Sequence, residues 1–325
     1  MVAASGGHLE ELWQLHRRLP LNGEITWVTD DTAQARSLLA GERIIFAPAA
    51  GPRDIRGTLA LTHFARSLLR QGAWEQVIST GPLIAVPFLM LARHYGGEPH
   101  YIESCARLSA PSLTGRLLEQ RPAVNCYSPY RWWQRNTWLY RGSVLDGFVP
   151  APASGSALRR VVVTVGISSY GFRNLLTRLV TALPPDCEVL WQTGATDISE
   201  LGIEARPYLP EPELIARMAA ADLVISHAGV GSALTAMRAG HAPLLIPRAA
   251  ARGEHIDDHQ RQIAAELKQR GLAQVFDLDD DDRALSRALY AAVGGRVQAA
   301  PAPPGFMLVQ RSPQRRFRAP AASTR

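Results

Sequence analysis

The stretch Leu223-Val224-Ile225-Ser226-His227-Ala228-Gly229-Val230-Gly231-Ser232 decides the fold class. Its first three residues form the apolar run expected of a buried strand, and the glycines turn the chain into a helix over residues 233–239. Such a turn presents backbone N–H groups and the positive end of a helix dipole to an anion. Gly229 and Gly231 let backbone approach a phosphate closely, and His227 and Ser232 add side-chain donors.

A second polar loop follows one strand and one helix later. The apolar strand 243–247 leads to Glu254-His255-Ile256-Asp257-Asp258-His259-Gln260. Because the carboxyl ends of parallel strands share one edge of a sheet, we expect both loops to face one crevice. A lone Gly-x-Gly also fits an ordinary turn, but the pair of loops favours a ligand site.

Metal binding is the competing interpretation of the second loop. His255 and His259 are spaced for zinc ligation with Glu254 or Asp258. A helix N-terminus can stabilise a leaving diphosphate without a cation, so no metal ion is predicted. The acidic run 279–282 is interpreted as the N-cap and first turn of a helix over 283–293 rather than as a metal site.

Alternating strands and helices recur along the chain and predict doubly wound parallel sheets. A Pro-, Ala- and Ser-rich stretch at 151–158 is typical of a linker, and the alternation restarts after it. We therefore predict an α/β fold with two Rossmann-like domains, residues 1–150 and 159–295, facing across a cleft. Residues 296–325, rich in Pro, Ala and Arg, are predicted to be a disordered basic tail.

Charge and apolar runs bear on partners. The formal net charge is +6, but residues 296–325 alone carry six arginines and no acid. The domains are therefore near neutral, and no nucleic acid partner is predicted.

The longest apolar run, 83–92, is far short of the roughly 20 residues of a spanning helix. No signal peptide is predicted, and three cysteines without CxxC spacing favour a reducing cytoplasm.

Three segments are candidates for peripheral membrane contact. The stretch 130–141 combines three Trp, two Tyr and three Arg, which fits either a membrane interface or aromatic packing in an interdomain seam. The apolar helix expected at 83–94 and the basic tail are the other two.

The motifs resemble those of GT-B glycosyltransferases. Ser5-Gly6-Gly7-His8, Glu103-Ser104-Cys105-Ala106-Arg107 and residues 111–118 look like the membrane-associated acceptor subunit of the two-subunit GlcNAc transferase that extends dolichol-linked sugars, and like bacterial exopolysaccharide transferases. The segments 163–166, 227–232 and 254–260 resemble its donor-binding partner and the C-terminal half of the family 28 peptidoglycan GlcNAc transferase. One chain would thus fuse both halves.

The resemblance implies a function and a set of site residues. It implies an inverting, metal-independent transfer from a UDP-sugar, as substrate rather than cofactor, to a polyprenyl-diphosphate-linked saccharide at an anionic membrane surface, on the cytoplasmic side of the plasma membrane. Donor contacts are expected at Gly166, Ser168, Tyr208, Leu209, His227, Ala228, Gly229, Gly231, Ser232, Glu254, His259 and Gln260. Acceptor-side contacts are expected at Ser5, Gly6, Gly7, Gly81 and Arg107.

The sequence departs from the family pattern at one position. Relatives often carry a glutamate that holds the ribose hydroxyls five residues before the closing glycine of this helix, and here Thr235 occupies that place. How ribose is held is therefore left open, as are the donor sugar and the oligomeric state.

His8 is predicted to be the general base. Inversion requires the acceptor hydroxyl to attack opposite the leaving diphosphate, so the base should come from the N-terminal domain. The unperturbed pKa of His8, near 6.5, suits proton acceptance. The alternative without a catalytic role is that His8 caps the first helix or contacts an acceptor phosphate. Glu103 is the alternative base.

Two alternative functions also fit the sequence. They are a UDP-sugar 2-epimerase and a non-catalytic sugar-nucleotide-binding subunit.

Overall fold

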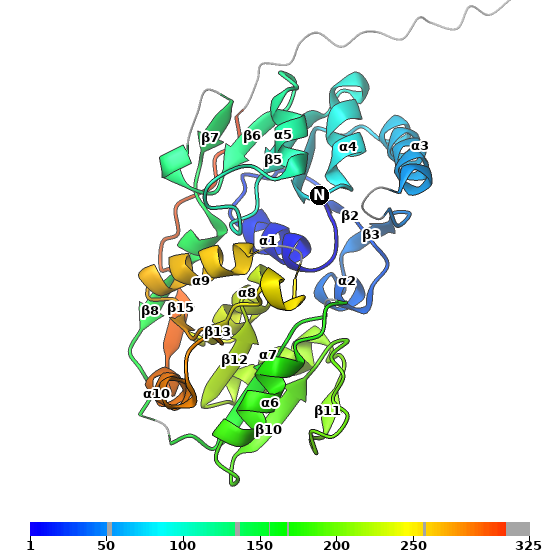
Figure 1. Ribbon diagram of the computed structural model, residues 1–325. Coiled ribbons are helices and arrows are strands. Elements are labelled where there is room, and N and C mark those ends of the chain that lie inside the picture. Colours follow the sequence, from blue (N-terminus) through cyan, green and yellow to red (C-terminus); the bar gives the residue numbers. More distant parts are fainter. Residues whose placement is uncertain (51–53, 134–136, 156, 168, 256–257, 310–325) are drawn as a thin grey trace, which may run out of the picture.

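Two parallel sheets form the two domains (Figure 1). The computed structural model describes residues 1–50, 54–133, 137–155, 157–167, 169–255 and 258–309. In these residues the N-terminal sheet has the order β3-β2-β1-β4-β5-β6-β7 and the C-terminal sheet the order β11-β10-β9-β12-β13-β14. Six strands of each sheet follow the 3-2-1-4-5-6 order of a Rossmann fold. The predicted fold class is confirmed.

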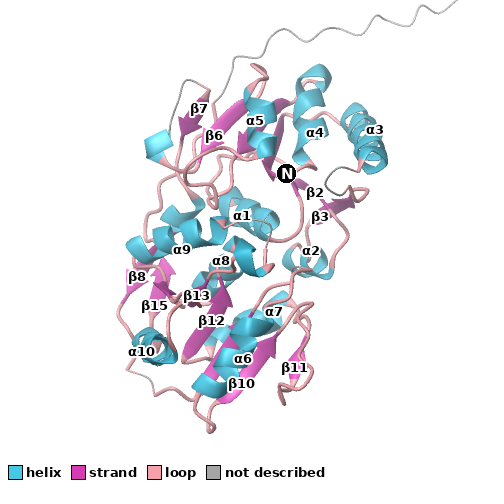
Figure 2. Cartoon of the chain, viewed as in Figure 1, coloured by secondary structure: helices cyan, strands magenta, loops and turns pink. Residues whose placement is uncertain are grey.

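The N-terminal domain alternates strands with helices, and Figure 2 shows this alternation. Its strands are β1 Val2–Ala3, β2 Thr26–Thr29, β3 Arg43–Phe46, β4 Gln76–Gly81, β5 Glu98–Ile102, β6 Asn125–Ser128 and β7 Trp138–Tyr140. Its helices are α1 Gly7–His16, α2 Ala33–Leu38, α3 Ile55–Gln71, α4 Ala85–Ala92 and α5 Leu113–Glu119, with short 3-10 turns η1 Arg93–Tyr95, η2 Arg131–Trp133 and η3 Val144–Gly147.

The C-terminal domain repeats the pattern. Its strands are β9 Arg160–Thr164, β10 Glu188–Gln192, β11 Ala205–Arg206, β12 Leu223–His227, β13 Leu244–Ile246 and β14 Gln274–Val275. Its helices are α6 Arg173–Ala182, α7 Glu211–Ala219, α8 Val230–Arg238, α9 His259–Gln269 and α10 Asp282–Ala292, with η4 Ala250–Arg252. The predicted N-cap in the acidic run is confirmed, because the Asp281 carboxylate accepts a hydrogen bond from the backbone N–H of Ala284 at 2.7 Å.

Among the described residues, one apolar cluster spans both domains, and two further clusters lie within the C-terminal domain. Leu9 and Leu12 of α1 belong to the same cluster of buried side chains as Leu234 and Met237 of α8. A polar contact also crosses between the domains: Arg238 of α8 bonds a carboxylate oxygen of Glu10 in α1 at 3.0 Å, and Glu211 of its own domain holds the same guanidinium at 2.5 Å. The interface between α1 and α8, which buries apolar side chains and an arginine, therefore fixes the position of one sheet relative to the other.

The predicted disordered tail is wrong for residues 296–309. Strand β15 (Arg296–Ala299) pairs antiparallel with β8 (Phe148–Ala151), and the chain then returns to the N-terminal domain. There the Phe306 side chain is fully buried, with its ring edge-on to that of Tyr127 at 5.5 Å. We call residues 296–309 the C-terminal strap. Residues 310–325 lie outside the described residues.

Removing the anchor of this strap should lower stability. We expect Phe306→Ala to reduce the free energy of unfolding by about 3 kcal/mol, because it empties a fully buried aromatic site. Urea unfolding followed by circular dichroism would measure the change. Met307→Ala, at an exposed neighbouring position, is the matched control and should alter stability by about 0.5 kcal/mol or less. Equal effects of the two variants would contradict a buried anchor.

Two of the predicted membrane segments are mainly interior. Tyr130, Trp133 and Trp138 are buried, which supports the aromatic-packing alternative, whereas Trp132 is 61% exposed. Helix α4 begins at Ala85 and buries most of its apolar side chains, leaving Met90 exposed. Among the described residues, no helix is long and apolar enough to cross a membrane.

Candidate active site

A crevice of about 520 Å³ lies between the domains, at the carboxyl ends of both parallel sheets. The N-terminal domain contributes Ser5, Gly6, Gly7, His8, Glu10, Thr32, Gln34, Ser104 and Ala106 to its lining. The C-terminal domain contributes Thr164, Gly166, Ile167, Gln192, Tyr208, Leu209, Glu211, Leu214, Met218, His227, Gly229, Val230, Gly231, Ser232, Thr235, His255, His259 and Gln260. Most of the predicted site residues are therefore brought together.

Two helix N-termini meet in this crevice. A Cβ atom added to Gly231 would lie 3.2 Å from the Cα of Gly7, so the turns that open α8 and α1 touch through glycine backbone. The N-cap residues, Gly6 and Gly229, have no side chain to cap these helices, although the Gln34 side chain accepts a hydrogen bond from the Gly6 backbone N–H. Uncapped N–H groups and two positive dipole ends thus face one space, which favours an anion there.

The imidazole of His227 lines the crevice from the C-terminal domain, next to the turns at Gly166 and Gly229. Its Nε2 lies 3.1 Å from the Ser232 hydroxyl, and its Nδ1 lies 3.5 Å from the amide nitrogen of Gln260. A side chain on Gly229 or Gly166 would overlap this ring. Burial first, and then the charge of Arg248, lowers the pKa of His227 to about 3. The ring is therefore neutral at pH 7 and can donate one hydrogen bond to an anion.

The end of the crevice beside α7 is mainly apolar. Leu214 and Met218 of α7 line it beside Tyr208 and Leu209. The Gln192 side chain accepts a hydrogen bond from the backbone N–H of Leu209 at 3.1 Å and so fixes this segment. The Thr235 hydroxyl donates to the carbonyl of Gly231 in its own helix at 2.9 Å, although the residue does line the crevice.

His8 occupies the acceptor side. Its Nδ1 lies 2.8 Å from the carbonyl oxygen of Thr80, and the Thr80 hydroxyl donates to the carbonyl of His8 at 2.7 Å. This carbonyl requires the proton on Nδ1 and leaves the lone pair on Nε2. Burial, and to a smaller degree the charges of Arg107 and His259, lowers the pKa of His8 to about 4. The ordinary pKa assumed from the sequence is thus wrong for this site.

Glu103 does not line the crevice, contrary to its prediction as an alternative base. It is buried, and its carboxylate accepts hydrogen bonds from the Tyr101 hydroxyl and from the backbone N–H and hydroxyl of Ser112, at 2.8–3.0 Å. These contacts fix the loop before α5. Burial raises the pKa of Glu103, but its oxygens are engaged away from any substrate.

Glu254 also differs from its predicted role. Its carboxylate accepts a hydrogen bond from the backbone N–H of Ala249 at 2.9 Å and pairs with Arg252 at 3.2 Å, behind the crevice wall. Ala228 is buried beneath the turn and does not line the crevice either. Ser168 lies outside the described residues.

Two acceptor-side residues lie at the edge rather than in the lining. A Cβ atom on Gly81 would come within 3.8 Å of the His8 ring, so Gly81 leaves room for this imidazole. Arg107 is half-buried and its charge acts on His8. The His255 and His259 rings pack edge-on at 4.9 Å. In the described part of the chain, no three His, Cys, Asp or Glu side chains gather as a metal site.

Sequence reasoning missed several lining residues. Glu10 and Gln34 come from helices of the N-terminal domain, and Glu211 begins α7. Gln192 is the last residue of β10, and a polar residue at the carboxyl end of a predicted central strand was an available signal for it.

Two Rossmann-like domains facing across such a crevice define the GT-B arrangement of glycosyltransferases. Solved structures of this arrangement match the chain: Acinetobacter baumannii MurG has a TM-score of 0.56 at 19% identity, with 90% of each chain covered. The calicheamicin glycosyltransferase CalG4 gives 0.55 at 15%, covering 90% of this chain and 89% of that one. A UDP-N-acetylglucosamine 2-epimerase also gives 0.55, at 8%, covering 88% and 85%.

Residues 160–276 match the glycosyltransferase family 28 C-terminal domain, which confirms the family predicted for the donor half. Relatives along the whole chain are named UDP-N-acetylglucosamine–N-acetylmuramyl-(pentapeptide) pyrophosphoryl-undecaprenol N-acetylglucosamine transferase. The protein from Parasynechococcus marenigrum (strain WH8102) is 24% identical over 94% of this chain and 91% of its own length. The one from Prochlorococcus marinus (strain MIT 9303) is 27% identical over 92% and 88%.

Proposed function

We propose that this protein is an inverting glycosyltransferase that moves N-acetylglucosamine from UDP to a polyprenyl-diphosphate-linked saccharide. The observation that carries the proposal is the meeting of the α1 and α8 N-termini beside His8 and His227 in one crevice. The relatives' names point to the donor, to the lipid-linked acceptor and to cell-wall rather than exopolysaccharide synthesis. The likeness of residues 1–150 to an acceptor subunit fits the same proposal.

The donor would lie across the C-terminal half of the crevice. Its uridine fits the apolar end beside Leu209, and its diphosphate fits the N-terminus of α8 with His227 and Ser232 as donors. His259 and Gln260 follow this loop and offer hydrogen bonds to sugar hydroxyls. Backbone N–H groups and the helix dipole stabilise the leaving diphosphate as charge develops on it.

The acceptor would approach from the N-terminal domain. His8 Nε2 takes the proton from the attacking hydroxyl while the bond from the anomeric carbon to the diphosphate oxygen breaks on the opposite face. The Thr80 carbonyl holds the ring in the tautomer that this step needs. The products are the glycosylated acceptor, UDP and a protonated His8 that releases its proton to solvent.

One incubation separates the candidate reactions. UDP-N-acetylglucosamine is supplied with and without a polyprenyl-diphosphate saccharide, in the presence of EDTA. Acceptor-dependent UDP release with a glycosylated lipid supports the proposal. Acceptor-independent formation of the C2 epimer would identify an epimerase, whose fold also matches. Binding without turnover under either condition would identify a non-catalytic subunit.

A lipid-linked acceptor requires contact with a membrane, and α3, α4 and α5 offer a surface for it. These helices lie side by side in Figure 1 and contact one another through α4. Leu113 of α5 is 84% exposed and Ile55 of α3 is 75% exposed, and each has a second exposed leucine one helical turn on, Leu117 and Leu59. Exposed apolar pairs of this kind favour an interfacial site.

We expect the protein to float with anionic liposomes, and less at high salt. The double variant Leu113→Glu/Leu117→Glu should lower the floated fraction several-fold, because it places charge on the apolar pair. Tyr290→Glu, at an exposed position on α10 of the other domain, is the control. A separate variant lacks only residues 310–325, which carry five arginines, and its floated fraction measures how much of the membrane binding depends on them. Unchanged flotation of the double variant would contradict this surface.

A further inference from the structure

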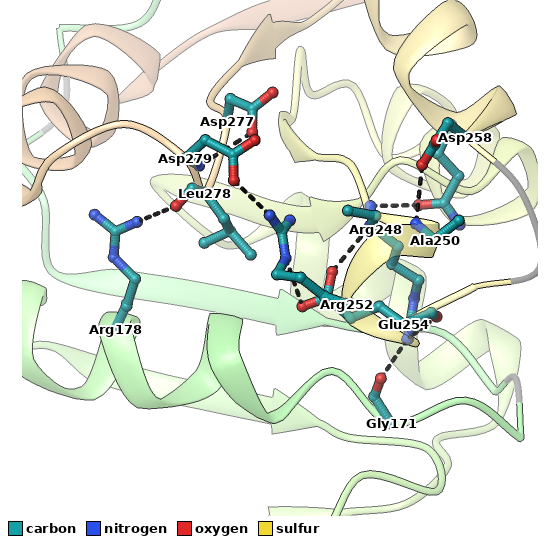
Figure 3. A network of polar contacts seen from close by, with 12 residues as sticks. Gly171, Arg178, Arg248, Ala250, Arg252, Glu254, Asp258, Asp277, Leu278 and Asp279 are labelled. Atoms are coloured by element: carbon teal, nitrogen blue, oxygen red, sulfur yellow. Dashed lines mark hydrogen bonds and ion pairs between the residues drawn. The ribbon is translucent and has the colours of Figure 1, made fainter.

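Arg248, two residues after the end of β13, is a buried charged residue in the C-terminal domain. Its side chain is only 1% exposed. The guanidinium donates to four backbone carbonyls: Nη2 to Val165 at 2.8 Å, and Nη1 to Tyr170, Gly171 and Glu254 at 2.9, 2.7 and 3.2 Å. Figure 3 shows Arg248 between Gly171 and the loop that carries Glu254. One side chain thus joins two loops that are about 80 residues apart in the sequence.

The guanidinium of Arg248 makes no direct ion pair in the part of the chain that the structure describes, because the nearby Glu254 carboxylate bonds Ala249 and Arg252 instead. Carbonyl dipoles and the face of Phe172, 4.6 Å from the guanidinium carbon, are what solvate it. Burial lowers the pKa of Arg248 to about 10, the negative charge of Glu254 opposes this shift, and the group remains charged at neutral pH. A buried charge that makes no direct ion pair is costly for folding alone.

The diphosphate that leaves in the proposed reaction carries negative charge, which the positive charge of Arg248 would stabilise. The described residues that line the crevice include no lysine or arginine. Arg248 stands behind the diphosphate side: it holds Val165, next to Gly166, and its backbone N–H donates to the Gln260 side chain at 3.1 Å. Gln260 in turn lies against His227. The lowered pKa of His227 owes part of its shift to Arg248, which indicates that the field reaches this ring.

We propose that Arg248 is a positioning residue for the nucleoside diphosphate. Its guanidinium fixes the backbone at 165 and 170–171 relative to the loop 248–254, and it directs a buried positive charge at the diphosphate from behind His227. The inference rests on the proposed function, because it takes the diphosphate of a UDP-sugar as the group that the Arg248 charge attracts. It goes beyond the proposed function by naming a residue that does not touch the substrate.

Calorimetric titration with UDP and with uridine tests the assignment. We expect Arg248→Met to weaken UDP binding by about 10- to 100-fold and to leave uridine binding within about twofold, because the charge acts on the diphosphate. Arg248→Lys keeps the charge but cannot reach four carbonyls at once, so we expect a smaller loss for UDP. This conservative variant decides the test if Arg248→Met does not fold.

Arg178→Met is the matched control. Arg178 also donates to backbone carbonyls, those of Leu278 and Asp280, and also lies over a phenylalanine, Phe276 at 5.2 Å, but outside the crevice lining. Its loss should leave both affinities unchanged. Equal losses for UDP and uridine in the Arg248 variants, or no loss for UDP, would overturn the assignment. A wild-type protein that binds no UDP would refute the proposed function, and the inference with it.

Discussion

Replacing His8 by alanine is expected to lower the turnover number by about 10²–10⁴-fold, the usual effect of losing a general base. UDP affinity should change by less than about twofold, because His8 comes from the domain opposite the diphosphate loop. Steady-state kinetics with a lipid-linked acceptor and titration with UDP measure the two quantities. The carbonyl of Thr80 leaves only Nε2 of this ring free to accept a proton.

The pH dependence follows from the lowered pKa of His8. Because its pKa in the empty crevice is about 4, His8 is neutral at all higher pH values and loses its acceptor lone pair only below that point. The acid limb of kcat/KM that belongs to His8 should therefore lie near pH 4 rather than near 6.5. A bound diphosphate favours the imidazolium, so the corresponding limb of kcat should lie at higher pH.

Glu103→Gln is the control for this prediction. The neutral amide removes the acceptor for some of the hydrogen bonds before α5 and should lower stability more than turnover at permissive temperature. Near-normal turnover in His8→Ala, together with a large loss in Glu103→Gln, would assign the base to Glu103 after all.

The second large effect is expected at Gly229. Gly229→Val should abolish measurable UDP binding, because a Cβ atom there would overlap Cε1 of His227 and lie 2.8 Å from Nε2 and 2.9 Å from Nδ1 of the same ring. Either the imidazole leaves its place beside Ser232 or the turn before α8 moves, and both changes displace the proposed phosphate donors.

Two further variants test whether the loss of UDP binding comes from displacement of the His227 ring or from a Cβ atom in the space of the phosphate. Gly155→Val places a side chain where nothing lies within 4 Å, so UDP affinity should not change. His227→Ala removes the ring that Gly229→Ala would meet. If the ring is the obstacle, adding Gly229→Ala to His227→Ala should cost little more binding. A large additional loss would instead mean that the Cβ occupies phosphate space, as the sequence alone had indicated.

The two loops that decide the fold were predictable because local chemistry specifies them. An apolar strand, a glycine turn and an amphipathic helix need little help from the rest of the chain, and β12 with α8 follows that pattern closely. The reason for the second glycine was not accessible, since Gly231 touches Gly7, more than 200 residues away.

Burial could not be predicted for the charged residues. Glu103 and Glu254 lie after strands as His8 does, but hydrogen bonds from the backbone N–H groups of Ser112 and Ala249 turn their carboxylates away from the crevice. Strand β15 is similar: nothing in its composition distinguishes it from the Pro- and Arg-rich residues after it, and pairing with β8 creates it.

The β8–β15 ribbon carries both passages of the chain between the domains. A single covalent connection would allow rotation in every direction, whereas two hydrogen-bonded strands bend readily across their plane and resist twisting and sliding. The buried α1–α8 contact ties the domains together at a second place, so we expect any relative movement to be a small bend of the ribbon about one axis. The Gly7–Gly231 contact sets how closely the two helix N-termini approach in that movement.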